Sequence, residues 1–113
     1  ARILILGVTF KEDVSDIRNS KVVDLINELK QYHIKVDVID PHASHHEIKE
    51  EYGFEMVQTA AGRYDGVVVA VQHQAYKNLP ESYFIELMNP NAIFVDLKGV
   101  YRNKIRSMNY WSL

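Results

Sequence analysis

Charged side chains concentrate in the segment GVTFKEDVSDIRNSK, residues 7–21, which lies between an apolar tract and an amphipathic one. Its charged members are three bases and three acids: Lys11, Arg18 and Lys21, with Glu12, Asp13 and Asp16. The dipole of the helix expected to follow disfavours cations near its start. The bases are therefore expected either to pair with the acids in a solvated salt-bridge cluster or to bind an anionic ligand.

The same segment does not match a dinucleotide-binding loop. Such a loop reads G-x-G-x-x-G and turns tightly into a helix, whereas this one has a single glycine, Gly7, and is longer. Asp40 follows KVDVI at the place where a ribose-binding acid would lie in a dinucleotide fold. Without the glycines, the simpler interpretation of Asp40 is a cap at the end of a strand, before Pro41.

Two further groups of side chains could bind ligands. Lys98 follows the tract AIFVDL and could contact phosphate or be an ordinary surface lysine. His42, His45 and His46 supply nitrogen atoms at spacings that could suit zinc. No carboxylate or thiolate pattern completes that set, so we predict a solvated helix start and no metal site.

Strands and helices are expected to alternate along the chain. We predict strands at 2–6, 35–40, 54–57, 67–71 and 92–97, and helices at 22–29, 44–52 and 80–88. A turn is expected at 89–91 and a C-terminal tail at 99–113. Several strands are apolar without alternation, which is typical of a parallel sheet covered on both faces. The sequence therefore predicts an α/β fold: a Rossmann-like, doubly wound and mainly parallel sheet of about five strands.

Composition limits the partners of this fold. The 113 residues suit one small domain, and a formal charge of -2 gives no reason to expect nucleic-acid binding. The chain contains no cysteine, which excludes disulfides and a thiol nucleophile within it and fits a cytoplasmic protein. Neither a membrane span nor a signal peptide is expected. A strand that begins almost at Ala1 suggests a single domain, 1–113, cut from a longer chain.

Four motifs in order, GVTFKEDVSDIRNSKVVDLINEL, KVDVIDP, YDGVVVAVQH and FVDLKGVY, resemble the C-terminal domain of the UDP-glucose/GDP-mannose dehydrogenase family. The resemblance is strongest to bacterial enzymes that act on UDP-N-acetylhexosamines for capsule or O-antigen synthesis. It implies a missing N-terminal domain that binds most of NAD and a missing central region that forms the homo-oligomer. The implied reaction oxidises the sugar C6 alcohol to a carboxylate in two hydride transfers.

The resemblance also implies roles for individual residues. Phe10 and Lys11 would contact the UDP-sugar, and Arg18 would reach NAD held by the other domain. Lys98 takes the place of an arginine in the UDP-glucose branch, so a bidentate contact is lost there. The catalytic cysteine would lie upstream, which leaves no catalytic residue in this chain. Which nucleotide sugar is used is not predicted.

Two alternatives share the alternating architecture. One is a signalling receiver module, which needs an acidic pair after its first strand and a phosphorylatable aspartate after its third. Here Gly7, Val8 and Thr9 follow the first predicted strand, and Gln58 follows the third. The other alternative is a stand-alone flavodoxin-like binding domain. The abrupt start of the chain and its long charged first segment count against that one.

Overall fold

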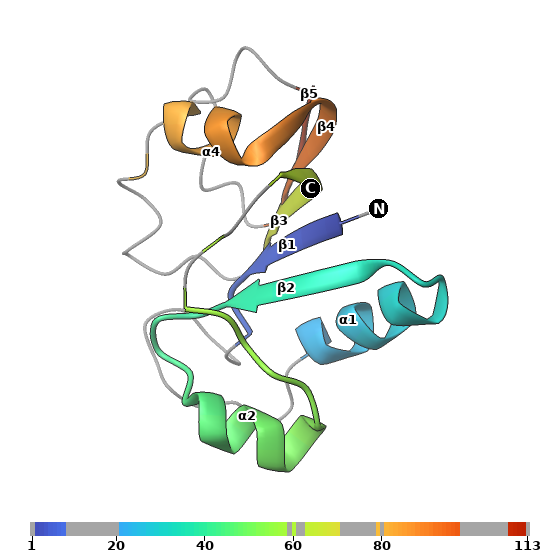
Figure 1. Cartoon of the computed structure of the whole chain (residues 1–113), viewed down its shortest axis with the longest axis vertical. Coiled ribbons are helices and arrows are strands. Elements are labelled where there is room, and N and C mark those ends of the chain that lie inside the picture. Colours follow the sequence, from blue (N-terminus) through green and yellow to red (C-terminus); the bar gives the residue numbers. More distant parts are fainter. Residues whose placement is uncertain are drawn as a thin grey trace.

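The computed structural model describes residues 2–8, 21–58, 60, 63–70, 79, 81–97 and 109–112. Within these ranges the chain forms five strands and three helices (Figure 1). In chain order they are β1 (Arg2–Leu6), α1 (Lys21–Gln31), β2 (Lys35–Ile39), α2 (His45–Tyr52), β3 (Tyr64–Val69), α4 (Glu81–Leu87), β4 (Met88–Asp96) and β5 (Asn109–Ser112). No described helix combines the length and the apolar character needed to cross a membrane.

The strands form one sheet in the order β2-β1-β3-β4-β5, and every neighbouring pair is parallel. This confirms the predicted Rossmann-like α/β fold. The strand order reverses between β1 and β3, because β2 lies on one side of β1 and all later strands lie on the other. In register, Leu6 pairs with both Ile39 and Val69. β2, β1 and β3 therefore end at the same level, where such sheets bind ligands.

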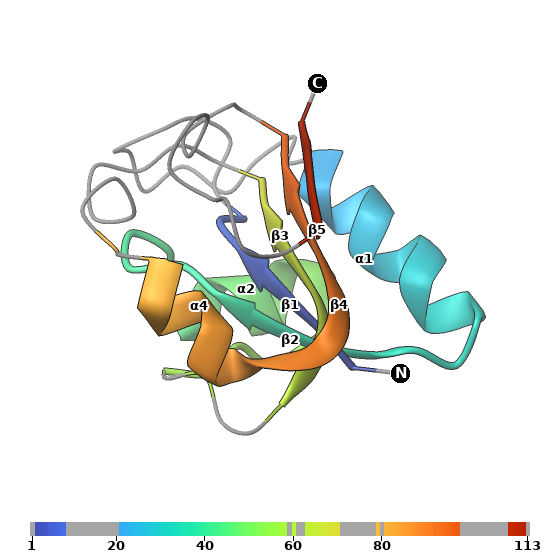
Figure 2. The same cartoon turned by 90° about the horizontal axis from the view of Figure 1, so that it is seen from above.

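Two apolar clusters cover the two faces of the sheet, because successive side chains of a strand point to opposite faces. Ile5 belongs to the cluster that includes Val23 and Ile26 of α1. Leu4 and Leu6 belong to the other cluster, which includes Phe84 of α4. Figure 2 shows α1 and α4 on opposite sides of the sheet. The predicted amphipathic helix at 22–29 is thus confirmed, with its apolar stripe packed on the sheet.

Helix α2 follows the predicted 44–52 closely, and both of its ends have a local cause. The Ser44 hydroxyl accepts a hydrogen bond from the Glu47 N–H at 3.3 Å, as an N-cap does. At the other end Gly53 adopts a left-handed φ of 78°, and its N–H donates to the Lys49 carbonyl. These two residues explain why a helix with mostly exposed side chains begins and ends where the sequence predicts.

The predicted strand at 54–57 is wrong. Phe54 and Met56 are buried in the cluster beneath α1, and Glu55 between them is exposed. This alternation of buried and exposed side chains, which is typical of a strand, here arises from packing against the helices. The Val57 N–H does donate to the Val38 carbonyl at 3.0 Å, which holds the segment beside β2. The third strand of the chain is therefore Tyr64–Val69, which begins three residues before the predicted 67–71.

The C-terminal part also differs from the prediction. The turn expected at 89–91 lies inside β4, where the register shifts: Tyr64 pairs with Met88 but Gly66 pairs with Ile93. Pro90, which has no N–H, falls in this irregular stretch, as is typical of proline in a sheet. The expected tail contains β5, which pairs with β4 along its four residues. The aromatic content of that segment favours a strand.

Candidate functional site

Backbone hydrogen bonds extend the sheet one residue past the ends of β1, β3 and β4. The N–H of Gly7 donates to the Ile39 carbonyl at 2.8 Å, and the N–H of Ala70 donates to the Leu6 carbonyl at 2.9 Å. The N–H of Leu97 donates to the Val69 carbonyl at 3.0 Å. We call this side of the sheet, formed by Gly7, Asp40, Ala70 and Leu97, the carboxyl edge. Its loops therefore start from fixed points.

Gly7 has a turning role at this edge. Its φ is 100°, in the left-handed region that other residues adopt only with strain. The next residue, Val8, is fully buried. The glycine therefore lets the chain leave β1 and bury Val8. The single glycine of the charged segment thus has a conformational reason that involves no phosphate.

Asp40 joins two loops at the carboxyl edge. The residue is only 3% exposed. Its Oδ2 accepts a hydrogen bond from the Val8 N–H at 2.7 Å, and its Oδ1 accepts one from the His42 N–H at 2.8 Å. The second bond confirms the predicted cap after β2. The first was missed, because Val8 lies 32 residues earlier and the sequence contains no local sign of the contact.

A second buried carboxylate lies at the end of β4. Asp96 is completely buried and accepts a hydrogen bond from the Tyr110 hydroxyl at 2.6 Å. Tyr110 comes from β5, so this contact joins the last two strands at the same edge. Asp96 is not among the functional residues that the sequence predicts. Its position two residues before Lys98 was the available signal.

The four residues that the resemblance placed in contact with ligands, Phe10, Lys11, Arg18 and Lys98, lie outside the described residues. Their described chain neighbours do lie at defined places. Val8 precedes the first of them and is anchored by Asp40, and Lys21 begins α1. Leu97 precedes Lys98 and is anchored to β3. The roles of the four residues stay predictions.

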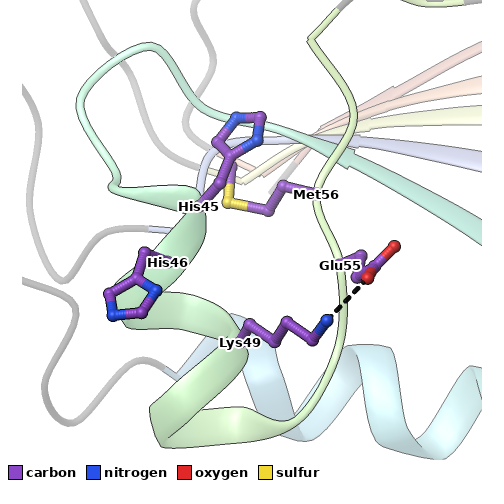
Figure 3. Close-up of a pocket in the computed structure, with 5 residues that line it drawn as sticks. All are labelled: His45, His46, Lys49, Glu55 and Met56. Carbon is purple, nitrogen blue, oxygen red and sulfur yellow. Dashed lines mark hydrogen bonds and ion pairs between the residues drawn. The ribbon is translucent and has the colours of Figure 1, made fainter.

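The predicted histidine cluster does not form a common site in the described part of the chain. Figure 3 shows the rings of His45 and His46 pointing in different directions at the start of α2. The Nε2 atom of His46 lies 3.0 Å from the Glu50 carboxylate, one turn along the helix. No group of three potential metal ligands occurs among the described residues. The His46 side chain is 79% exposed, as a solvated helix start requires, and the absence of a metal site stays a prediction.

An open pocket lies beside these histidines, with a volume of about 310 Å³. It is lined by His45, His46, Lys49, Glu55 and Met56 (Figure 3). The Lys49 ammonium lies 2.9 Å from the Glu55 carboxylate. This hydrogen bond, with the charge of the lysine, lowers the pKa of Glu55. Lys49 and Glu55 neutralise each other, so this ion pair gives the pocket no net charge that could attract a ligand.

Comparison with known proteins identifies the family. Residues 4–103 match the model of the "UDP-glucose/GDP-mannose dehydrogenase family, UDP binding domain". The chain is 43% identical over 99 residues to a UDP-N-acetyl-D-glucosamine 6-dehydrogenase of Pseudomonas aeruginosa, covering 87% of this chain and 24% of that protein. It is 38% identical over 101 residues to Protein CapL of Staphylococcus aureus, covering 88% of this chain and 24% of that protein. The chain thus spans about a quarter of these relatives.

Solved structures agree with this assignment. The UDP-N-acetyl-mannosamine dehydrogenase Cap5O from Staphylococcus aureus superposes with a TM-score of 0.76 at 26% identity, over 98% of this chain and 26% of that one. An NDP-N-acetyl-D-galactosaminuronic acid dehydrogenase from Methanosarcina mazei gives a TM-score of 0.87 over 99% of this chain and 24% of that one. Its 20% identity supports the fold alone. The chain therefore belongs to the UDP-glucose/GDP-mannose dehydrogenase family and corresponds to its UDP-binding domain.

Proposed function

We propose that residues 1–113 form the C-terminal nucleotide-sugar-binding domain of a longer, NAD-dependent UDP-N-acetylhexosamine 6-dehydrogenase. The observation that carries the proposal is the match of residues 4–103 to the UDP-binding domain of the family. The full enzyme would be a cytoplasmic homo-oligomer, assembled through its central region, that supplies capsule or O-antigen synthesis. It would convert the C6 alcohol and water to a carboxylate while two NAD accept two hydrides.

Within this enzyme, the carboxyl edge would hold the nucleotide part of the substrate. Phe10 and Lys11 follow Val8 within three residues of the sequence, and Val8 is anchored at the end of β1, beside the point where the strand order reverses. Lys11 would offer a positive charge to the diphosphate, and Phe10 would pack against the substrate. Lys98 follows the anchored Leu97 and would add a second, weaker charge.

NAD would be held mainly by another domain. The first loop lacks the glycine fingerprint of a dinucleotide site. In addition, both oxygens of Asp40, the acid in the ribose-binding position, accept main-chain N–H groups. Arg18 would reach the cofactor from this domain across the cleft between the two. The absence of cysteine agrees with a nucleophile that lies elsewhere in the full chain.

The test of the proposed function compares the 113-residue chain with the full-length protein. Incubated with NAD and UDP-N-acetylglucosamine or UDP-N-acetylmannosamine, the isolated domain is expected to form no NADH, because it has neither a cofactor fingerprint nor a thiol nucleophile. The full-length protein should form two NADH for each sugar oxidised. Turnover by the domain alone, or none by the full-length protein with either sugar, would contradict the proposal.

Arg18→Ala should impair the use of NAD more than the use of the sugar. A cation near the start of a helix is poorly placed unless an anion from outside approaches it. Steady-state kinetics of the full-length enzyme should show KM for NAD raised about fivefold to tenfold, which corresponds to about 1–1.4 kcal/mol, the net contribution of one ordinary hydrogen bond. The control is Lys35→Ala, because Lys35 is exposed at the start of β2, opposite the carboxyl edge. A raised KM for the UDP-sugar with unchanged KM for NAD would refute the assignment.

A further inference from the structure

We infer that Asp40 is a positioning residue for the segment after β1 that contains Phe10 and Lys11. Its buried carboxylate fixes the point at which the chain leaves β1. This inference rests on the function proposed above. It assigns to Asp40 a task other than ribose binding, which is the task that its place after β2 would have in a dinucleotide fold. The contacts that support it are all at the carboxyl edge.

The carboxylate is shared between two loops. Oδ2 holds the Val8 N–H of the loop after β1, and Oδ1 holds the His42 N–H of the loop after β2. Bonds from an N–H to an ionised acceptor are shorter and stronger than neutral ones, and the two distances of 2.7 and 2.8 Å fit that class. One side chain therefore sets the relative position of two loops that are far apart in sequence.

Burial makes this link hard to replace. Val8 is fully buried and Asp40 is 3% exposed, so water cannot readily take over the Val8 N–H if the carboxylate is removed. Gly7, immediately before, is already tied to β2 through its own N–H. The chain is thus held at two consecutive residues before it enters the segment that contains Phe10 and Lys11.

The influence of Asp40 should be greatest at the Lys11 end of the segment. Lys11 comes three residues after Val8, whereas Arg18 comes three residues before Lys21, where α1 begins. Helix α1 is fixed separately, by Val23 and Ile26 packed on the sheet. A change at Asp40 should therefore displace Lys11 more than Arg18, the residue proposed to reach NAD.

The experiment uses Asp40→Asn in the full-length enzyme. Asparagine keeps the size of the side chain but replaces one acceptor oxygen by an NH2 group, which cannot accept the second N–H. We expect KM for the UDP-sugar to rise about tenfold and KM for NAD to change less than twofold. If this variant does not fold, Asp40→Glu can replace it, because glutamate keeps the charge and displaces it by one methylene. KM for the UDP-sugar is again expected to rise more than KM for NAD.

Asp37→Asn is the matched control. Asp37 lies in the middle of β2, the strand that Asp40 follows, and its side chain is also mostly buried. Its partners are the first residues of β1 and β3, away from the carboxyl edge: it accepts from Tyr64 Oη at 2.6 Å and from Arg2 at 3.1 Å. This variant should lower the melting temperature without changing either KM. If Asp40→Asn also lowered only the melting temperature, its role would be purely structural and the inference would be wrong.

A double-mutant cycle separates this inference from the proposed function. If Asp40 acts through the loop, Asp40→Asn should reduce kcat/KM for the UDP-sugar much less in a Lys11→Ala background than in the parent enzyme. If both single variants reduced kcat/KM strongly and their effects were fully additive, the positioning role of Asp40 would be overturned, while the proposed function of the domain would stand. If Lys11→Ala alone had no effect, the substrate contact proposed for Lys11 would fail instead.

Discussion

Replacing Lys11 by alanine should lower kcat/KM for the UDP-sugar about tenfold to hundredfold in the full-length enzyme. A hydrogen bond to a charged group contributes about 1.5–3 kcal/mol, and loss of that stabilisation translates directly into kcat/KM. In the sequence the lysine comes three residues after Val8, which is anchored beside the point where the strand order of the sheet reverses. We therefore expect it to be the strongest single contact between this domain and the nucleotide sugar.

Two other lysines provide the comparison for this experiment. Lys98→Ala should reduce kcat/KM less, because we propose a weaker contact there than at Lys11. Lys35→Ala, at the exposed start of β2 on the opposite edge, should leave kcat/KM unchanged. Thermal melts of all variants check that folding is intact. A value for Lys11→Ala within twofold of the parent would mean that the charged segment is a solvated salt-bridge cluster.

The sheet was predictable because its central strands are buried on both faces. β1 and β3 read as apolar runs, RILIL and VVV, and parallel strands with covered faces require such runs. Helix α2 was predictable for a different reason, since Ser44 and Gly53 mark its two ends in the sequence itself. In both cases the signal that decides the structure lies within the element.

Errors arose where the deciding contact is distant in sequence. Phe54 and Met56 alternate with exposed neighbours like a strand, but they are buried against α1 and α2 rather than aligned in a ladder. β5 exists because it pairs with β4 and because Tyr110 stacks on Phe94 at 5.9 Å between ring centroids. The pattern of residues within a short segment indicates which side chains are buried, but it does not indicate which helix or strand they pack against.

The same distinction applies to the candidate site. The carboxyl edge followed from topology, because parallel strands end together at one side of the sheet. The double role of Asp40 did not, because its partner Val8 is brought near by the β1–β2 pairing. Asp96 was missed for the same reason: its partner, the Tyr110 hydroxyl, belongs to β5, in a segment for which the sequence predicts a tail.

Phe84→Ala should lower the free energy of unfolding of the domain by about 3–5 kcal/mol. Phe84 is completely buried in the cluster between α4 and the sheet. Its ring meets that of Phe94 edge-on, with 4.8 Å between centroids. Helix α4 has only seven residues and is too short to be stable alone. Its place on the sheet therefore depends on this side chain.

The effect should extend from α4 to the carboxyl edge, because Phe94 also stacks on Tyr110, whose hydroxyl binds Asp96. Urea denaturation of the domain measures the change in unfolding free energy. Ile85→Ala is the matched control: Ile85 is the next residue of the same helix, but it is 47% exposed, so its loss should cost less than about 1 kcal/mol. Equal losses for the two variants would mean that the apolar cluster beneath α4 is not packed around Phe84, and that the link from α4 to Asp96 does not stabilise the domain.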